Sequence, residues 1–491
     1  MTIPAQALQA VAAVVGDRWV RQAPSELDTY ASDGLPTRRS RPGAVVLPGS
    51  REEVVELVRV LSHHRVPFVA RGAGTGLSGG ALADRNAVVV VLTRLNRILD
   101  IQPENRLAVV EPGVVNVRLS EAVAPHGLHY APDPSSQTAC TLGGNVAENA
   151  GGPHCLKYGV TSNHVLELEV VLSNGDVVTL GSRGGEPWGS DLVGLFVGSE
   201  GMFGIAIRIT VRLTPLPQAV ETLLADFPTV RSAGEAVSAI IASGIVPGAL
   251  EMMDQGCVAA VEASIYAAGY PTDAAAVLLA EVDGRDAASV AGEAREVEGI
   301  LRDHGARSVR VATEAAERAR LWQGRKKAFG ALGRVSPNLV VQDAVVPRSR
   351  LPDILETIGD IGERYGVTVT NVFHAGDGNL HPNINFDRSD EDQVERVEAA
   401  SEAIMKACID AGGSITGEHG VGIDKLRYMT LMFDSDTLSA MRAIRRVFDP
   451  QEIANTGKVV PIHACREWAA AAATRRQGDP RSDDRALHVG A

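Results

Sequence analysis

The chain has 491 residues, which is too long for one compact core and predicts two or three domains. It carries 47 basic and 60 acidic side chains, and its formal charge of −13 argues against nucleic acid as a partner. Hydrophobic residues make up 45% of the chain and aromatic residues only 4%, so we expect an aliphatic core. This composition excludes a disordered chain, a coiled coil and a small disulfide-stabilised domain.

No segment of the sequence indicates a membrane or secretory protein. The aliphatic runs, such as residues 87–92, are far shorter than the ~18 to 20 residues that cross a bilayer. The N-terminus lacks a basic region followed by a hydrophobic one, so no secretory signal is expected. The five cysteines form no CxxC pair, which argues against an iron–sulfur or zinc-ribbon site within this chain. We therefore expect a cytoplasmic protein with reduced thiols and no membrane span.

The first elements alternate short strands with a helix. Residues 44–47 read as a strand, and Ser50 and Glu53 form an S-x-x-E capping box that starts a helix through residue 63. A second strand, residues 66–70, runs directly into a loop with five glycines, residues 71–80. This order predicts a strand that delivers a flexible, side-chain-poor loop.

A hairpin and a regular strand follow before the pattern breaks. Residues 166–172 and 177–180 flank an Asn-Gly turn, which predicts a β-hairpin. Residues 205–213 alternate strictly between isoleucine, valine or leucine and other residues, which predicts a half-buried strand. The sequence Thr214-Pro-Leu-Pro217 interrupts this pattern, and we expect a domain boundary there.

Beyond this boundary, strand-like runs alternate with longer helical stretches. The strand-like runs are residues 277–282, 308–312 and 367–373, and the clearest helix is residues 391–411. Residues after 468 lack periodicity and are expected to form a flexible tail.

Three glycine-rich segments in the first half suggest close contact with an anionic ligand. Residues 71–80 contain GxGxxG, but this loop leads to a strand rather than a helix and has no lysine. It therefore matches neither a Rossmann dinucleotide site nor a Walker A loop. A second segment, residues 132–152, and a third, residues 197–204, have similar composition. One such loop alone is often just a tight turn, whereas three together favour backbone approach to one large ligand.

The second half contains a cluster of histidines. The turn 376–379 should bring His374 close to His381, with Asn383 and Asn385 on the same strand face as His381. Glu418 offers a carboxylate beside His419, and adjacent side chains of extended backbone should diverge, so that His419 points elsewhere. Two imidazoles and a carboxylate suit a divalent metal ion, while the alternative is histidines that only cap strand ends.

The glycine segments, together with residues 48–55, resemble the FAD-binding domain of the vanillyl-alcohol oxidase and p-cresol methylhydroxylase superfamily. The resemblance implies that the first loop holds the FAD pyrophosphate and that the others flank the isoalloxazine and adenosine. The first loop contains no histidine, so non-covalent FAD is implied. The implied FAD-binding residues are Arg71, Gly72, Gly74, Thr75, Gly76, Leu77, Ser78, Gly79, Gly80, Pro132, Asp133, Thr138, Gly143, Gly144, Asn145, Ala147, Asn149, Gly151, Tyr158, Gly159, Glu200, Gly201, Ile205 and Asn455.

The patterns HxGDGNxH at 374–381 and EHGxG at 418–422 closely resemble the C-terminal domain of FAD-linked 2-hydroxy-acid dehydrogenases. That group includes D-lactate and D-2-hydroxyglutarate dehydrogenases and, most similar through residues 248–254, 269–273 and 449–450, the D subunit of glycolate oxidase. By resemblance His374, His381 and Glu418 bind the metal (Zn or Mn/Fe), and His419 is the catalytic base. Arg325 and Asn383 are then substrate-binding residues. The alternative for Arg325 is a solvated helix charge beside two lysines.

The resemblance also implies the architecture. The expected fold is α+β, with a two-part FAD-binding domain of that superfamily and an α+β cap domain built on an antiparallel sheet. We assign residues 1–216 to the FAD-binding domain and 217–450 to the substrate domain with the metal site. Residues 451–467 are expected to return to the FAD site, and 468–491 to form the tail.

The implied reaction is the oxidation of glycolate or D-lactate to the 2-oxo acid, with electrons passed to a partner subunit or a quinone. A D-lactate or D-2-hydroxyglutarate dehydrogenase is the alternative, although Val341 stands where the latter enzymes carry a lysine for the distal carboxylate. An alkyl-dihydroxyacetone-phosphate-synthase-like transferase and a metal-dependent hydrolase remain weaker alternatives. Implied partners are an iron–sulfur subunit and a second flavin-type subunit, which could place the chain at the inner membrane; a homo-oligomer is a further expectation.

Overall fold

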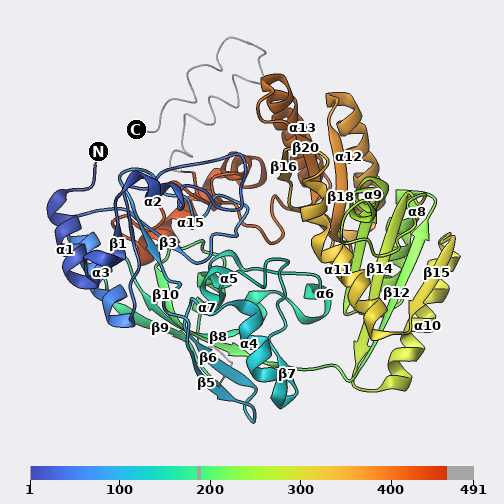
Figure 1. The fold of residues 1–491 in the computed structure, drawn as a ribbon, viewed down its shortest axis with the longest axis horizontal. Coiled ribbons are helices and arrows are strands. Elements are labelled where there is room, and N and C mark those ends of the chain that lie inside the picture. The colour runs from blue at the N-terminus through green and yellow to red at the C-terminus, as the bar shows by residue number, and fades with distance from the viewer. Residues whose placement is uncertain (1, 185–188, 462–491) are drawn as a thin grey trace.

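The computed structural model describes residues 2–184 and 189–461, which form three larger β-sheets, one two-stranded sheet and the surrounding helices. Figure 1 shows the first half of the chain on one side, in blue to green, and the second half on the other, in yellow to orange. The last helices cross back to the first side. The expected tail, residues 468–491, and the end of the returning segment, 462–467, lie outside the described residues.

The first sheet positions the first glycine loop. Its order is β1-β2-β4-β3, and the pairs β2–β4 and β4–β3 are parallel. Helix α3 crosses between β2 and β3, and the Ser50 hydroxyl accepts a hydrogen bond from Glu53 N at its start, as the capping box predicts. All four valines of β4 are buried, because helices and neighbouring residues cover both faces of this small sheet. The elements are α1 (Ala5–Val15), β1 (Val20–Arg21), α2 (Pro24–Asp28), β2 (Ala44–Val46), α3 (Arg51–His63), β3 (Phe68–Arg71) and β4 (Val88–Val91).

The second sheet is antiparallel, with the order β5-β6-β10-β8-β9. Its strands are β5 (Ile98–Gln102), β6 (Leu107–Val110), β8 (Val165–Val171), β9 (Val177–Gly181) and β10 (Ile205–Arg212). Strands β8 and β9 form the predicted hairpin. Helices α4 (Asn116–Val123), α5 (Leu142–Glu148), α6 (Cys155–Tyr158) and α7 (Leu192–Phe196) lie in its connections, and the short strands β7 (Leu128–His129) and β11 (Thr214–Pro215) pair beside it.

The prediction that residues 205–213 form a half-buried strand is wrong. Strand β10 is the centre of its sheet and is buried on both faces. A register shift between Ala206 and Arg208 changes which face the alternating residues occupy. Ile205 therefore packs in the core of the first sheet, while Ile209 packs in the core of the second.

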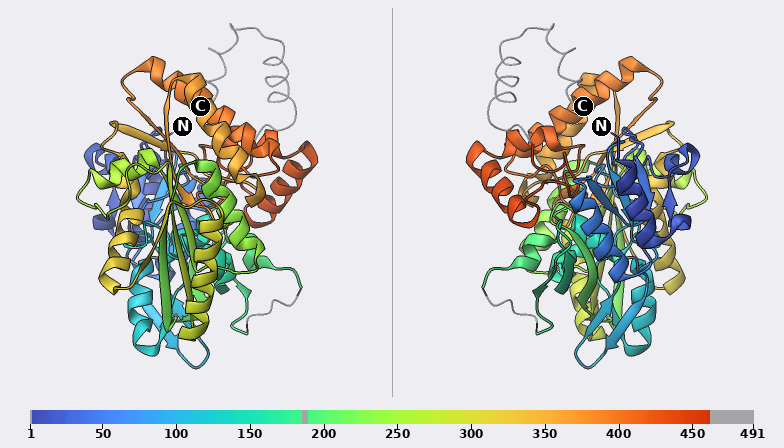
Figure 2. Two further views of the ribbon diagram at one scale, coloured as in Figure 1. Left: turned by 90° about the vertical axis from the view of Figure 1, so that its right-hand side faces the viewer. Right: turned by 90° about the vertical axis from the view of Figure 1, so that its left-hand side faces the viewer.

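The third sheet occupies the second half of the chain and confirms the expected antiparallel α+β cap. Its strand order is β15-β12-β14-β13-β18-β19-β17, and β20 joins β16 to β18. Successive side chains of β14 pack in two different hydrophobic cores. Leu278 packs with α8, α10, α12 and α13, while Leu279 packs with α9 and α11. Helices thus cover both faces, and the left view of Figure 2 shows the yellow-green strands with helices beside them.

The elements of this half have the following bounds: β12 (Ala219–Phe227), α8 (Val230–Ala242), β13 (Ala249–Asp254), α9 (Gln255–Glu262), β14 (Ala276–Gly284), α10 (Ala287–Asp303), β15 (Ser308–Ala312), α11 (Ala315–Leu332), β16 (Asn338–Val341), β17 (Ala344–Val345), α12 (Leu351–Tyr365), β18 (Thr368–His374), β19 (Asn379–Leu380), β20 (Pro382–Phe386), α13 (Glu391–Asp410), α14 (Met429–Met432) and α15 (Ser435–Phe448).

The chain returns to the first sheet after α15. Phe68 N donates to Ile453 O at 2.8 Å, and Asn455 N donates to Phe68 O at 2.8 Å. This segment therefore adds to the edge strand that leads into the first glycine loop. Among the described residues, none of the helices combines the length and the apolar character that a bilayer crossing requires.

Candidate active site

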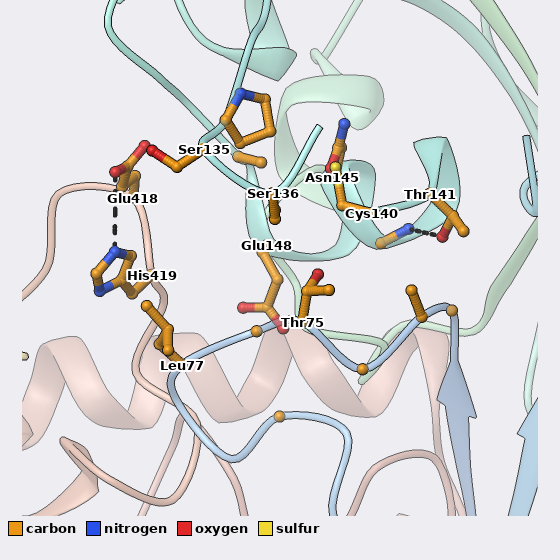
Figure 3. Close-up of a pocket in the computed structure, with 18 of the residues that line it drawn as sticks. Thr75, Leu77, Ser135, Ser136, Cys140, Thr141, Asn145, Glu148, Glu418 and His419 are labelled. Carbon is orange, nitrogen blue, oxygen red and sulfur yellow. Dashed lines mark hydrogen bonds and ion pairs between the residues drawn. The ribbon is translucent and has the colours of Figure 1, made fainter. Parts of the chain in front are cut away.

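A cavity of about 590 Å³ lies between the two halves of the chain. Residues from the first two glycine segments, from α11 and from the histidine cluster line it. Figure 3 shows Glu418 and His419 at one side of this pocket, and Cys140, Thr141 and Asn145 at the other. The structure thus brings together the two groups of residues that the sequence analysis identified separately.

Four glycines of the first loop, Gly72, Gly74, Gly79 and Gly80, leave no room for a side chain. A Cβ added to Gly72 would lie 2.2 Å from Thr141 Oγ1, and one added to Gly80 would lie 2.7 Å from Glu148 Oε1. Gly74 also has a φ of 72°, which favours glycine. Because the loop packs so closely against the second segment, its backbone can approach a ligand in the cavity, as an FAD cradle requires.

Many of the implied FAD-binding residues line this cavity. They are Arg71, Gly72, Gly74, Thr75, Gly76, Leu77, Gly80, Gly143, Gly144, Asn145, Ala147, Glu200 and Gly201. The others do not line it; they are Ser78, Gly79, Pro132, Asp133, Thr138, Asn149, Gly151, Tyr158, Gly159, Ile205 and Asn455. Several of these make structural contacts instead: Asn455 Nδ2 donates to Gly80 O at 3.1 Å, and the Tyr158 hydroxyl donates to Asp283.

Glu200 joins the third glycine segment to the histidine-bearing half. Its Oε1 accepts from Val421 N at 2.6 Å, and its Oε2 accepts from Gly422 N at 2.8 Å. Burial raises the pKa of Glu200 to about 7, and burial beside Glu200 raises the pKa of Glu148 well above its usual range. Both carboxyl groups lie next to residues 420–422, which follow His419 in the chain.

His374, His381 and Glu418 form the expected cluster. His374 Nε2 lies 3.2 Å from Glu418 Oε1, and His381 Nε2 lies 3.4 Å from the same oxygen. Candidate ligand atoms from all three residues lie within 4.8 Å of one another. Burial alone would raise the pKa of Glu418, but the neighbouring histidines lower it to about 2. Two imidazoles and an ionised carboxylate match the donor set of a zinc-type site.

Asp343 fixes the loop that carries Glu418 and His419, and the sequence analysis missed this role. Its carboxylate accepts from Gly417 N and His419 N, both at 3.0 Å, and forms an ion pair with Lys425 at 2.8 Å. Burial alone would raise the pKa of Asp343, but the Lys425 charge and the nearby histidines lower it well below its usual range. Asp343, His381 and His419 form a second geometric set for a metal ion. Since these donors already occupy the Asp343 oxygens, the set with Glu418 is the better candidate.

The side chain of His419 points in a different direction from the one expected. Its ring packs flat against His381, with centroids 4.8 Å apart and planes at 12°, and its Nε2 lies 3.8 Å from Glu418 Oε1. The side chains of Glu418 and His419 therefore do not diverge; both face the cavity. Burial lowers the pKa of His419 to about 4, so the imidazole is neutral at pH 7.

Arg325 is buried, at 5% exposure, so the interpretation as a solvated helix charge is wrong. Its guanidinium lies 2.5 Å from Glu251 Oε2, and Glu251 Oε1 lies 2.8 Å from His374 Nδ1. Burial alone would raise the pKa of Glu251, but Arg325 and His374 lower it. Glu251 thus orients both the arginine and the first histidine, a supporting contact typical of metal sites. Its position in the buried strand β13 gave no sequence signal for this role.

Unpartnered polar atoms face this region. Within the described part of the chain, His381 Nε2, Asn383 Oδ1 and Arg325 Nε are buried without a hydrogen-bond partner. Asn383 Nδ2 itself donates to His381 O at 2.6 Å. Buried polar atoms without partners are uncommon, so their concentration at one cavity fits a bound polar ligand or ion. The residues present therefore fit both a flavin and a divalent ion.

Comparisons with known proteins agree with this site. Residues 216–459 match the family model "FAD linked oxidases, C-terminal domain", and residues 42–181 match "FAD binding domain". The chain is 49% identical to the glycolate oxidase subunit GlcD of Escherichia coli over 446 residues, covering 91% of this chain and 89% of that protein. It is 32% identical to the mitochondrial D-lactate dehydrogenase [cytochrome] of Arabidopsis thaliana, covering 86% and 74%.

Solved structures confirm the fold. p-Cresol methylhydroxylase superposes with a TM-score of 0.79 at 19% identity, covering 92% of this chain and 95% of that one. Alkyldihydroxyacetonephosphate synthase superposes with a TM-score of 0.73 at 19% identity, covering 94% and 87%. The expected superfamily fold is thereby confirmed. The chain belongs to the FAD-linked oxidase family and is a flavoprotein oxidoreductase, similar to the glycolate oxidase subunit GlcD.

Proposed function

We propose that this chain oxidises a small 2-hydroxy acid, glycolate or D-lactate, to the corresponding 2-oxo acid. The observation that carries the proposal is that the glycine loops, the histidine cluster and the buried Arg325 line one cavity. The names of the relatives, glycolate oxidase subunit and D-lactate dehydrogenase, support this substrate class.

Two groups of residues would hold the cofactors. The glycine loops would hold FAD non-covalently, and bound FAD supplies the acceptor for the electrons that leave the substrate. His374, His381 and Glu418 would hold a divalent ion, Zn or Mn/Fe, which lowers the pKa of a hydroxyl group bound beside it.

His419 is the proposed base for the substrate hydroxyl. Its imidazole is neutral at pH 7 and can accept a proton, and it faces the same cavity as the cluster. The ring stack on His381 and the hydrogen bond from His419 N to Asp343 hold it in place. The substrate loses this proton and a Cα hydrogen with its electron pair, which together yield the 2-oxo acid.

Arg325 is the proposed partner of the substrate carboxylate. One of its nitrogens is held by Glu251 at 2.5 Å, while its buried Nε has no hydrogen-bond partner among the described residues. A planar guanidinium held in this way suits a carboxylate. Asn383 Oδ1 would bind a polar substrate group nearby. Val341 and Val372 also line the cavity, and their apolar surface favours a small side chain over the distal carboxylate of 2-hydroxyglutarate.

We further propose how the chain operates as part of a larger system. The GlcD relatives are named as subunits, and the sequence of this chain contains no CxxC motif, so electrons would leave through an iron–sulfur partner, a second flavin-type subunit or a quinone. We also propose residues 1–216 as the FAD-binding domain and 217–450 as the substrate domain. The alkyl-transferase alternative has only fold similarity, at 19% identity, which favours neither chemistry.

The variant His419→Asn tests the proposal. We expect a folded, yellow protein whose flavin is reduced by 2-hydroxy acids about 10² to 10⁴-fold more slowly, since a positioned base contributes about that much. His126→Asn is the control, because His126 is exposed at the end of a short 3-10 helix. Reduction at the wild-type rate in His419→Asn would contradict the proposal.

A further inference from the structure

A second cluster of charges lies beside the cavity, where α6 meets the cap sheet. His154 precedes α6, and its two ring nitrogens face two carboxylates from different halves of the chain. Nδ1 lies 2.9 Å from Asp133 Oδ2, and Nε2 lies 3.2 Å from Glu281 Oε1. Carboxylates only accept hydrogen bonds when ionised, so the ring satisfies both by donating from both nitrogens, which requires the imidazolium.

The surroundings of His154 favour this charged form. Burial alone would lower its pKa, but the charges and hydrogen bonds of Asp133 and Glu281 raise it to about 10. The pKa of Asp133 shifts downward: burial alone would raise it, but the charges of His154 and Lys326 lower it. His154 therefore carries a positive charge between the buried carboxylate of Glu281 and the half-buried carboxylate of Asp133.

Both carboxylates also contact helix α11. Glu281 Oε2 accepts from Trp322 Nε1 at 2.5 Å, and Asp133 Oδ2 lies 3.1 Å from Lys326 Nζ. The His154 ring itself packs against Trp322, with centroids 5.4 Å apart. Three contacts thus join the His154 region to one face of α11, and Figure 1 shows α6 and α11 at the boundary of the two halves.

The same helix carries Arg325. Residues 322, 325 and 326 are three and four positions apart, so they share one face of the helix. From Arg325 the contacts continue through Glu251 to His374 of the proposed metal site. Helix α11 therefore joins two sets of polar contacts, one from His154 to Trp322 and Lys326 and one from Arg325 to His374.

We propose that His154 is a positioning residue: as a cation bonded to Asp133 and Glu281, it holds α11 so that Arg325 meets the substrate carboxylate. The inference rests on the proposed function, because it assigns the arginine to a 2-hydroxy acid. His154 touches neither substrate nor cofactor in this scheme and acts only through the helix.

The variant His154→Gln tests this role in the flavin-loaded protein. Glutamine is neutral, and both of its N–H donors are on one nitrogen, so it cannot replace the two opposed N–H groups of the imidazolium. Asp133 and Glu281 then repel each other across the junction. Anaerobic stopped-flow reduction by glycolate and D-lactate measures the apparent Kd and the limiting rate separately. We expect the apparent Kd to rise about tenfold, which corresponds to 1.4 kcal/mol, and to change more than the limiting rate.

Lys157→Met is the matched control. Lys157 lies on α6, the helix that His154 precedes, and forms an ion pair with Asp283 on β14, the strand that carries Glu281. No contact between Lys157 and α11 is found among the described residues. We expect it to lose an interdomain ion pair without a change in the apparent Kd. An equal rise of the apparent Kd in His154→Gln and Lys157→Met would show that any change at the junction weakens substrate binding, and it would overturn the proposal.

The double variant His154→Gln/Arg325→Lys tests whether the change in apparent Kd depends on Arg325. If it does, His154→Gln adds little to the defect of Arg325→Lys, because both changes remove the same interaction. A fully additive effect overturns the proposal, as does a wild-type Kd in His154→Gln. If His154→Gln does not retain flavin, the variant Trp322→Phe is used instead. Phenylalanine keeps an aromatic ring beside His154 but cannot donate the hydrogen bond to Glu281. An unchanged apparent Kd in Trp322→Phe overturns the proposal.

The two proposals fail in different ways. A wild-type protein that no 2-hydroxy acid reduces contradicts the proposed function and this inference with it. A wild-type protein that glycolate or D-lactate reduces, with His154→Gln equal to it, contradicts the inference alone.

Discussion

Replacement of Asp343 by asparagine should release the loop that carries Glu418 and His419. The Asp343 carboxylate is 0% exposed and accepts from Gly417 N, His419 N and the Lys425 ammonium. Asparagine supplies one acceptor oxygen instead of two and has no charge. Its amide nitrogen would then face N–H donors that it cannot bond.

The size of the effect follows from these contacts. The change leaves the ammonium of Lys425, which is 1% exposed, without its ion-pair partner. Breaking a buried pair on one side costs roughly 3 to 5 kcal/mol of folding free energy. A residue that orients metal ligands typically contributes about 10 to 100-fold in metal affinity, and we expect a loss of that size for Zn²⁺.

Two measurements on Asp343→Asn check this expectation. Urea unfolding measures the loss of stability, and competition for Zn²⁺ with a chromophoric chelator measures the affinity. Asp254→Asn is the control, because Asp254 also accepts backbone N–H bonds, from Cys257 and Asn371, but caps α9 away from the loop. Wild-type Zn²⁺ affinity in Asp343→Asn would refute the account of the loop.

The remaining predictions concern the metal, the flavin and the domain junction. A chelator should suppress flavin reduction, and added Zn²⁺ or Mn²⁺ should restore it; unchanged turnover would make the cluster structural. Gly72→Ala should weaken FAD binding, measured by flavin retention on ultrafiltration, because its Cβ would lie 2.2 Å from Thr141 Oγ1. Gly292→Ala on α10, where nothing lies within 4 Å, should retain FAD, and equal retention in both would contradict the cradle. Because the folded pKa of His154 is raised from 6.5 to about 10, its stabilising effect is complete below pH 6.5 and is lost as pH rises towards about 10. The Tm difference between wild type and His154→Gln should therefore narrow over that range, and a widening difference would contradict the assignment.

Local sequence signals were sufficient for much of this fold. The Ser50 helix cap, the Asn-Gly hairpin and the HxGDGNxH turn each depend on residues a few positions apart, and the structure contains all three. The second bond of the capping box differs, because Glu53 Oε2 accepts from Gly49 N rather than from Ser50 N. The antiparallel cap sheet followed from the family resemblance. The strand β10 was misjudged because its burial depends on a register shift and on two neighbouring sheets, neither of which alternation can reveal.

The supporting residues of the site could not be found in this way. Glu251 contacts His374 across 123 positions, and Asp343 contacts Lys425 across 82. Each is a single acidic residue in or beside a buried strand, where the pattern predicts only structure. A surface charge remained the alternative for Arg325, because its ion pair with the distant Glu251 is not visible in the sequence. Contacts between distant segments decided these roles, so they required the structure.

The most direct test of the proposed reaction is an anaerobic titration of the flavin-loaded protein with glycolate, D-lactate and D-2-hydroxyglutarate. Oxidised FAD absorbs at about 450 nm, and the loss of this absorbance reports electron transfer from each acid to the flavin. We expect glycolate or D-lactate to bleach it and D-2-hydroxyglutarate to do so poorly, because Val341, which lines the cavity, stands by resemblance where 2-hydroxyglutarate enzymes carry a lysine. A flavin that stays oxidised with all three acids would contradict the account.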